Sequence, residues 1–124
     1  MAKIVVAEDD VHVLRLMAIW LSRAGHEVLE ARNGTEAKVY LDGGNVELLV
    51  TDVNMPGCDG IELVRWLRQD MNLQIPVITL SARCDQARIG ENLAGLNVSV
   101  HPKPFSPSRL SAEIEDLLAA KPTG

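Results

Sequence analysis

Short continuous runs of apolar residues alternate along the chain with stretches whose apolar positions recur every three or four residues. The continuous runs predict strands buried on both faces of a parallel sheet, and the spaced positions predict amphipathic helices. The predicted strands cover residues 4–7, 48–51, 76–80 and 97–100, with a weaker, partly polar strand beginning at Val28-Leu29. The predicted helices cover residues 11–24, 35–41, 61–69 and 85–93, and a last one begins at Ser106-Pro107.

This order gives five strand-then-helix units, which predict an α/β fold. Right-handed crossovers then produce a five-stranded parallel sheet, doubly wound, with helices on both faces. The arrangement is flavodoxin-like, with the strand order 2-1-3-4-5. A length of 124 residues fits one domain, which we assign to residues 1–120. Residues 121–124 are interpreted as a tail or the start of a linker.

Composition narrows the function classes. Twelve Lys and Arg against 17 Asp and Glu give a net charge of −5, so we expect no direct nucleic-acid binding by this domain. No apolar run approaches the roughly 20 residues of a membrane span. The acidic residues 8–10, with Lys3, argue against a signal peptide. Cys58 and Cys84 lie in no metal-ligand or redox spacing, and a cytoplasmic location is expected.

Polar side chains follow four of the predicted strands at one edge of the sheet. They are Glu8-Asp9-Asp10, Asp52, Ser81 and Lys103. Two carboxylates about 4 Å apart repel by roughly 4 kcal/mol at an effective dielectric constant of 20, so a hard divalent ion such as Mg²⁺ fits between them. Each residue alone also fits a helix cap, a turn or a solvated lysine. Together they predict a site for a phosphoryl group on a carboxylate nucleophile.

Four motifs at these strand ends carry a family resemblance. They are Asp9-Asp10 followed by Arg15, the segment Asp52-Val-Asn-Met-Pro-Gly-Cys-Asp-Gly60, Ser81-Ala82, and Lys103-Pro104-Phe105. In this order they resemble the receiver domain of bacterial two-component response regulators, over about residues 3–119. The resemblance implies a signalling phosphoacceptor, which catalyses only its own phosphotransfer and dephosphorylation, rather than an enzyme acting on another substrate.

The resemblance also implies roles for single residues. Asp52 is implied to take a phosphoryl group from the phosphohistidine of a sensor histidine kinase or phosphotransfer protein. The implied Mg²⁺ ligands are Asp10 directly, Asp9 through water, Asp52 itself and the backbone carbonyl of Asn54. Ser81 is implied to bond a phosphoryl oxygen. Lys103 is implied to pair with the phosphoryl group and to precede a cis peptide bond to Pro104.

The implied output of phosphorylation is a change in binding to an unknown output domain or protein, and a homodimer is possible. The family usually pairs the hydroxyl at position 81 with a Tyr or Phe three residues before the lysine, and the two act as the conformational switch. Val100 occupies that second position here, and Pro102 is a further departure. The residues needed for the phosphorylation chemistry are present. These two differences therefore concern how phosphorylation is communicated to partners.

Three alternatives remain from the sequence. A phosphatase of the haloacid dehalogenase type needs an Asp two residues after its nucleophile, where this chain has Asn54. A flavodoxin-like nucleotide binder needs a phosphate loop after the first strand, where residues 8–10 repel a phosphate. A receiver-fold docking module without regulated phosphorylation is compatible with every motif, and Val100 favours it.

Overall fold

The computed structural model describes residues 2–55, 57–82, 86–93, 95–103 and 106–119. Its strands are β1 (Lys3–Ala7), β2 (Glu27–Ala31), β3 (Leu48–Asp52), β4 (Val77–Ser81) and β5 (Val98–Pro102). They form one parallel sheet in the order β2-β1-β3-β4-β5. The predicted fold and strand order are therefore confirmed.

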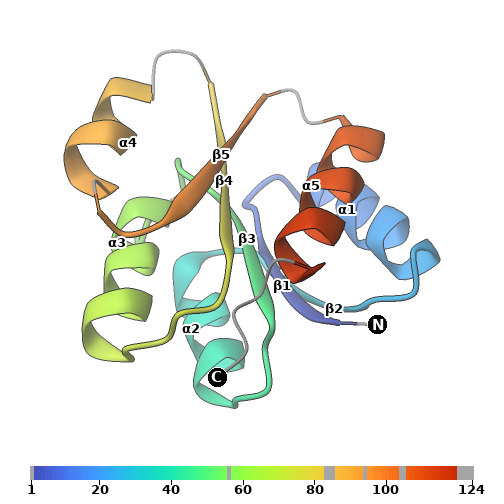
Figure 1. Cartoon of the computed structure of the whole chain (residues 1–124), viewed down its shortest axis with the longest axis horizontal. Coiled ribbons are helices and arrows are strands. Elements are labelled where there is room, and N and C mark those ends of the chain that lie inside the picture. The colour runs from blue at the N-terminus through green and yellow to red at the C-terminus, as the bar shows by residue number, and fades with distance from the viewer. Residues whose placement is uncertain (1, 56, 83–85, 94, 104–105, 120–124) are drawn as a thin grey trace.

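Helices cover both faces of this sheet (Figure 1). They are α1 (Val11–Arg23), α2 (Gly34–Asp42), α3 (Gly60–Arg65), η1 (Trp66–Asp70), α4 (Gln86–Leu93) and α5 (Pro107–Ala119). α1 and α5 lie on one face, and α2, α3 and α4 lie on the other (Figure 1). This is the doubly wound arrangement that the alternating pattern predicts.

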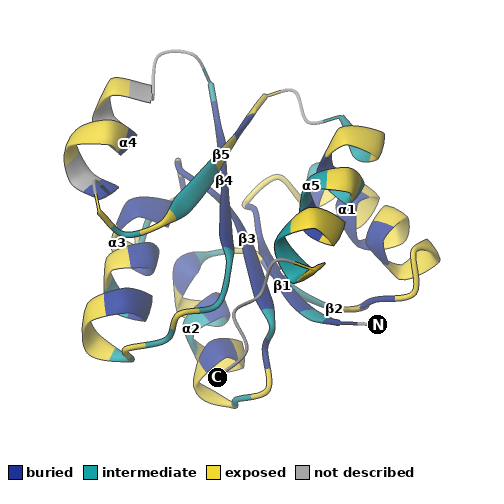
Figure 2. Ribbon diagram, viewed as in Figure 1, coloured by how far each residue is buried: buried dark blue, intermediate teal, exposed yellow. Residues whose placement is uncertain are grey.

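Successive residues of each strand point to opposite faces of the sheet and contribute to two separate hydrophobic clusters. Ile4, Val6 and Val50 pack with the apolar positions of α1 and α5, while Val5 and Leu49 pack with α2, α3 and α4. The central strands are consequently buried along their length, as Figure 2 shows. Because both faces are covered, the chemistry is confined to the edge where the strands end.

Several element ends are shifted by one residue from the sequence prediction, and two differences are larger. The helix expected over residues 61–69 changes at Trp66 from α-helical to π-helical bonding, and the Met71 N–H donates to the carbonyl five residues earlier, at 3.0 Å. The last strand continues past residue 100 to Pro102, so Lys103 follows it directly. The start of the helix predicted from residue 85 and the Lys103–Pro104 peptide lie outside the described residues.

The start of α3 is fixed against the end of β3. The Asp59 carboxylate caps the helix by accepting from the Glu62 N–H at 2.9 Å, and the Gly60 N–H donates to the Val53 carbonyl at 3.0 Å. A Cβ atom at Gly60 would collide with the backbone carbonyl of Asp52. The start of α3 at Asp59-Gly60 thus packs closely against the backbone at the end of β3. The sequence at this place shows only a turn signal.

Gly60→Ala is expected to lower the free energy of unfolding by about 1–3 kcal/mol, because the added methyl group forces backbone apart. Urea unfolding measures this change. Gly90→Ala in α4 is the matched control, since no atom lies within 4 Å of its added Cβ and alanine favours a helix. Equal stability of the two variants would contradict the predicted clash.

Candidate functional site

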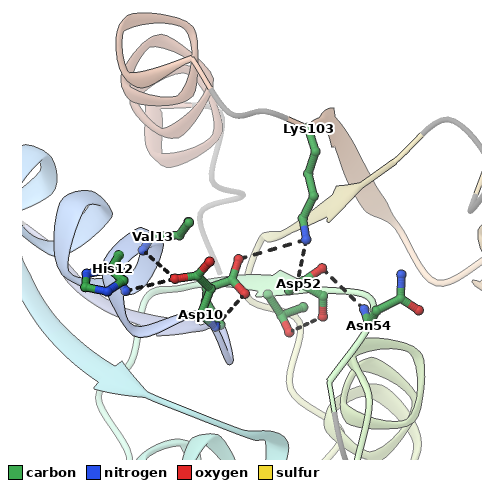
Figure 3. Close-up of polar contacts among 8 residues, drawn as sticks. Asp10, His12, Val13, Asp52, Asn54 and Lys103 are labelled. Atoms are coloured by element: carbon green, nitrogen blue, oxygen red, sulfur yellow. Dashed lines mark hydrogen bonds and ion pairs between the residues drawn. The ribbon is translucent and has the colours of Figure 1, made fainter.

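An ion pair joins the end of β3 to the residue that follows β5. The Lys103 Nζ lies 2.7 Å from the Asp52 Oδ2 and 4.0 Å from the Glu8 Oε1 (Figure 3). The side chains of Asp52 and Glu8 are each only 3% exposed, whereas that of Lys103 is 33% exposed. The lysine therefore reaches from the surface onto two buried carboxylates.

Three carboxylates gather at this point. One oxygen from each of Glu8, Asp9 and Asp52 lies within 4.8 Å of the others. The strand register explains the arrangement, because Ala7 pairs with Thr51 and the next residues, Glu8 and Asp52, are therefore level. Carboxylates this close repel one another unless a proton or a cation intervenes.

Burial and the neighbouring charges both shift the pKa values of Glu8 and Lys103. Burial raises the pKa of Glu8 from 4.5 to about 8; the Asp10 N–H bond opposes this rise, and the charge of Asp52 adds to it. Burial alone lowers the pKa of Lys103, but its hydrogen bond to Asp52 and the charges of Asp52, Glu8 and Asp9 outweigh burial, and the net pKa is raised. Each group thus has the protonation behaviour expected beside an excess of negative charge.

Asp10, to which the family resemblance assigns direct Mg²⁺ ligation, makes a capping contact in the structure. Its Oδ1 caps α1 by accepting from the His12 N–H at 2.9 Å and the Val13 N–H at 3.3 Å (Figure 3). Among the described residues, the carboxylate group contains Glu8 in place of Asp10. The close carboxylate group therefore consists of Glu8, Asp9 and Asp52, and Asp10 borders the same cavity.

Sequence reasoning counted Glu8 in the acidic run but gave it no role of its own. A usable signal was present, since strand alternation continued past Ala7 places Glu8 on the same face as Val6. Asp52 continues Val50 on that face in the same way. The run of three acids obscured this signal, because each member looks equivalent in the sequence.

The other predicted residues lie nearby. Ser81 ends β4, is 1% exposed, and its Oγ has no hydrogen-bond partner among the residues that the structure describes. The Lys103 N–H donates to the Ser81 carbonyl at 2.9 Å, which sets these two residues side by side. The Asn54 N–H donates to the Asp52 Oδ1 at 3.3 Å. The Ser81 hydroxyl is thus buried at the strand end beside the one that carries Asp52.

A cavity of about 850 Å³ opens beside Asp52 and Lys103. The carboxylates, Asn54 and Lys103 supply its polar wall, and Val13, Leu16 and Leu80 supply its apolar wall. A donor group therefore has room to approach Asp52 beside α1.

The sequence pattern of the response regulator receiver domain matches residues 4–115. The chain belongs to this family. Receiver domains are signalling phosphoacceptors of two-component systems, for which Mg²⁺ and phosphorylation are standard. Membership of this family decides against the dehalogenase-type and nucleotide-binding alternatives, which are other families.

Relatives of the receiver domain include short and long proteins. The chemotaxis protein CheY1 of Helicobacter pylori is 37% identical over 120 residues, which cover 94% of this chain and 96% of CheY1. The phosphate regulon transcriptional regulatory protein PhoB of Pseudomonas aeruginosa is 33% identical over 119 residues, but the match covers only 51% of PhoB. The chain thus spans about half the length of the transcriptional regulators it matches.

Solved structures agree with the fold. The receiver domain of the Francisella response regulator 1452 superposes with a TM-score of 0.86 at 28% identity, covering 96% of this chain and 98% of that one. Within the described part of the chain, each helix is too short or too polar to cross a lipid bilayer.

Proposed function

We propose that this receiver domain accepts a phosphoryl group on Asp52 from the phosphohistidine of a sensor histidine kinase or phosphotransfer protein. The observation that carries the proposal is the buried Asp52 carboxylate, paired with Lys103 at 2.7 Å and open to the cavity. An Asp52 oxygen attacks phosphorus, and the P–N bond breaks as the P–O bond forms. The imidazole nitrogen keeps the electron pair of that bond and takes a proton from water.

The donor set fits Mg²⁺, which prefers oxygen ligands and accepts one or two carboxylates together with water. Two of the carboxylates of Glu8, Asp9 and Asp52 would hold the ion directly, with the backbone carbonyl of Asn54 as a further ligand. When bound, the ion neutralises the clustered carboxylates and the phosphoryl oxygens.

Lys103 and Ser81 complete the chemistry from the protein side. The Lys103 ammonium pairs with a phosphoryl oxygen once Asp52 is phosphorylated and its carboxylate charge is lost. The Ser81 Oγ, buried and without a partner in the described structure, donates to another oxygen of that group. Both interactions strengthen as charge develops on the phosphoryl oxygens.

Incubation of the protein with acetyl phosphate and Mg²⁺ tests the proposal. Intact mass spectrometry is expected to show one added phosphoryl group that hydroxylamine removes, as an acyl phosphate requires. The same mixture with EDTA is the control, and its adduct should be strongly reduced. A docking module without phosphorylation gives no adduct in either mixture, which is the outcome that would overturn the proposal.

Ser81 and Val100 occupy the two switch positions through which phosphorylation would change the surface that partners contact. Val100 is 40% exposed on β5, and its short, β-branched side chain cannot turn inward as an aromatic ring does. We therefore expect phosphorylation to change the surface of α4 and β5 less than it does in aromatic-bearing receivers. The signal would leave through Ser81 and the segment that follows it, towards an output domain, an output protein or a second copy of the chain.

Amide NMR shifts with and without a beryllium fluoride mimic, in wild type and in Val100→Tyr, measure this difference. We expect small wild-type shifts over residues 97–101 and larger ones in the tyrosine variant. Large wild-type shifts in that strand, unchanged by the tyrosine, would show that β5 switches without an aromatic residue.

A further inference from the structure

A buried histidine lies two residues before Lys103 on β5. His101 pairs in register with Leu80 of β4, on the sheet face that packs against α1 and α5. It is 1% exposed. An imidazole at such a core position loses hydration at both ring nitrogens, so its place in the core depends on the partners that replace water.

Both nitrogens of His101 meet polar groups. The Ser106 N–H donates to Nε2 at 3.3 Å, so the ring proton of the neutral form resides on Nδ1. Nδ1 lies 3.1 Å from the Glu113 Oε2 of α5. The alignment of these two atoms falls short of a hydrogen bond, so we treat this contact as a close electrostatic one.

Hydrogen bonds are made at Lys103, directly after β5, and at Ser106, directly before α5. The Lys103 N–H donates to the Ser81 carbonyl at 2.9 Å. The Ser106 N–H is held by the His101 ring, and the Ser106 carbonyl accepts the Leu110 N–H at 2.8 Å as α5 begins. The imidazole thereby ties the start of α5 back to the strand from which Lys103 leaves.

We propose that His101 is a positioning residue for Lys103, holding the start of α5 against the end of β5 so that the ammonium meets Asp52. The inference rests on the proposed function, in which Lys103 binds the phosphoryl group. His101 touches no reacting atom, and its effect passes through the backbone of residues 103 and 106. A leucine of similar volume would fill the core position and leave the Ser106 N–H without its acceptor.

Three substitutions separate the two ring contacts. His101→Leu removes both. His101→Gln keeps an acceptor near the place of Nε2, and His101→Asn keeps a donor near that of Nδ1. We expect His101→Leu and His101→Asn to slow phosphorylation by acetyl phosphate about threefold to tenfold, since small misplacements of a charged group are costly in rate. His101→Gln should stay within about twofold of wild type, and Mg²⁺ affinity should be unchanged in all three.

A second histidine gives a matched control for stability. His26 is also buried, accepts from the Ala2 N–H at 3.1 Å and lies 3.1 Å from Glu115 of α5, but it holds no part of the Lys103 connection. His26→Leu should lower the melting temperature as His101→Leu does, without slowing phosphorylation. Equal rate losses in both variants would overturn the proposal, because they would mark a general effect of loosening α5.

A double-mutant cycle tests the route through Lys103. In a Lys103→Ala background, His101→Leu should change the phosphorylation rate by less than about twofold, since the group it positions is gone. A full loss in that background would overturn the inference. If wild type takes no phosphoryl group, the proposed function fails, and the NMR signals of the Lys103 side chain still decide this inference. His101→Leu must then shift them, and unchanged signals would refute it.

Discussion

Asp52→Asn is expected to abolish the hydroxylamine-labile phosphoryl adduct and to leave the fold intact. The amide that replaces the carboxylate is no nucleophile towards phosphorus, so the adduct should fall to background in intact mass spectra. Removing one of three clustered carboxylates also relieves their repulsion. The melting temperature should therefore equal or exceed that of wild type, which thermal unfolding followed by circular dichroism measures.

Asp70→Asn is the control for this variant, because Asp70 is exposed at the end of η1. It should be phosphorylated at the wild-type level. Full labelling of Asp52→Asn would place the nucleophile at another carboxylate, and the phosphorylated peptide would then identify that residue.

Asp9→Asn is expected to weaken Mg²⁺ binding by about tenfold or more, whereas Asp10→Asn should weaken it by less than about threefold. Asp9 contributes a full charge to the carboxylate group, and each such charge at about 4 Å is worth up to roughly 4 kcal/mol at an effective dielectric constant of 20. The Asp10 Oδ1 is engaged as the cap of α1, a role that asparagine performs equally well. Isothermal titration with MgCl₂ measures both affinities.

Both substitutions replace an Asp with the isosteric Asn at adjacent positions. Each variant therefore controls for the effect of removing one negative charge from this segment. This order reverses the one that the family resemblance implies when Asp9 and Asp10 are taken as the acidic pair. A larger loss in Asp10→Asn would restore Asp10 as the direct ligand and would mean that its capping carboxylate also reaches the ion.

The fold was predictable because its signals are local and repeated. The apolar run of β1 and the helical spacing of α1 each depend on which face of one element is buried. Five such units in series leave few topologies other than a parallel doubly wound sheet. The positions of Asp52, Ser81 and Lys103 followed from the same reasoning, since each stands where a strand ends.

Within the acidic run, the sequence alone did not separate the roles of its members. Glu8, Asp9 and Asp10 carry the same charge, and their roles depend on the direction in which each side chain points in the folded protein. The register of β1 against β3 puts Glu8 level with Asp52, and the first turn of α1 turns Asp10 towards the helix N–H groups. Both facts depend on contacts between elements, which a linear pattern does not contain.

The sequence by itself thus determined the architecture, the family motifs and the strand ends at which the chemistry lies. The tertiary structure decided which carboxylates meet, that Gly60 packs against the Asp52 backbone, and that the His101 ring reaches the start of α5. The reason is physical: periodicity encodes which face of an element is buried, whereas a site depends on distances between side chains from different elements. Those distances are set only when strand register and helix packing are fixed together.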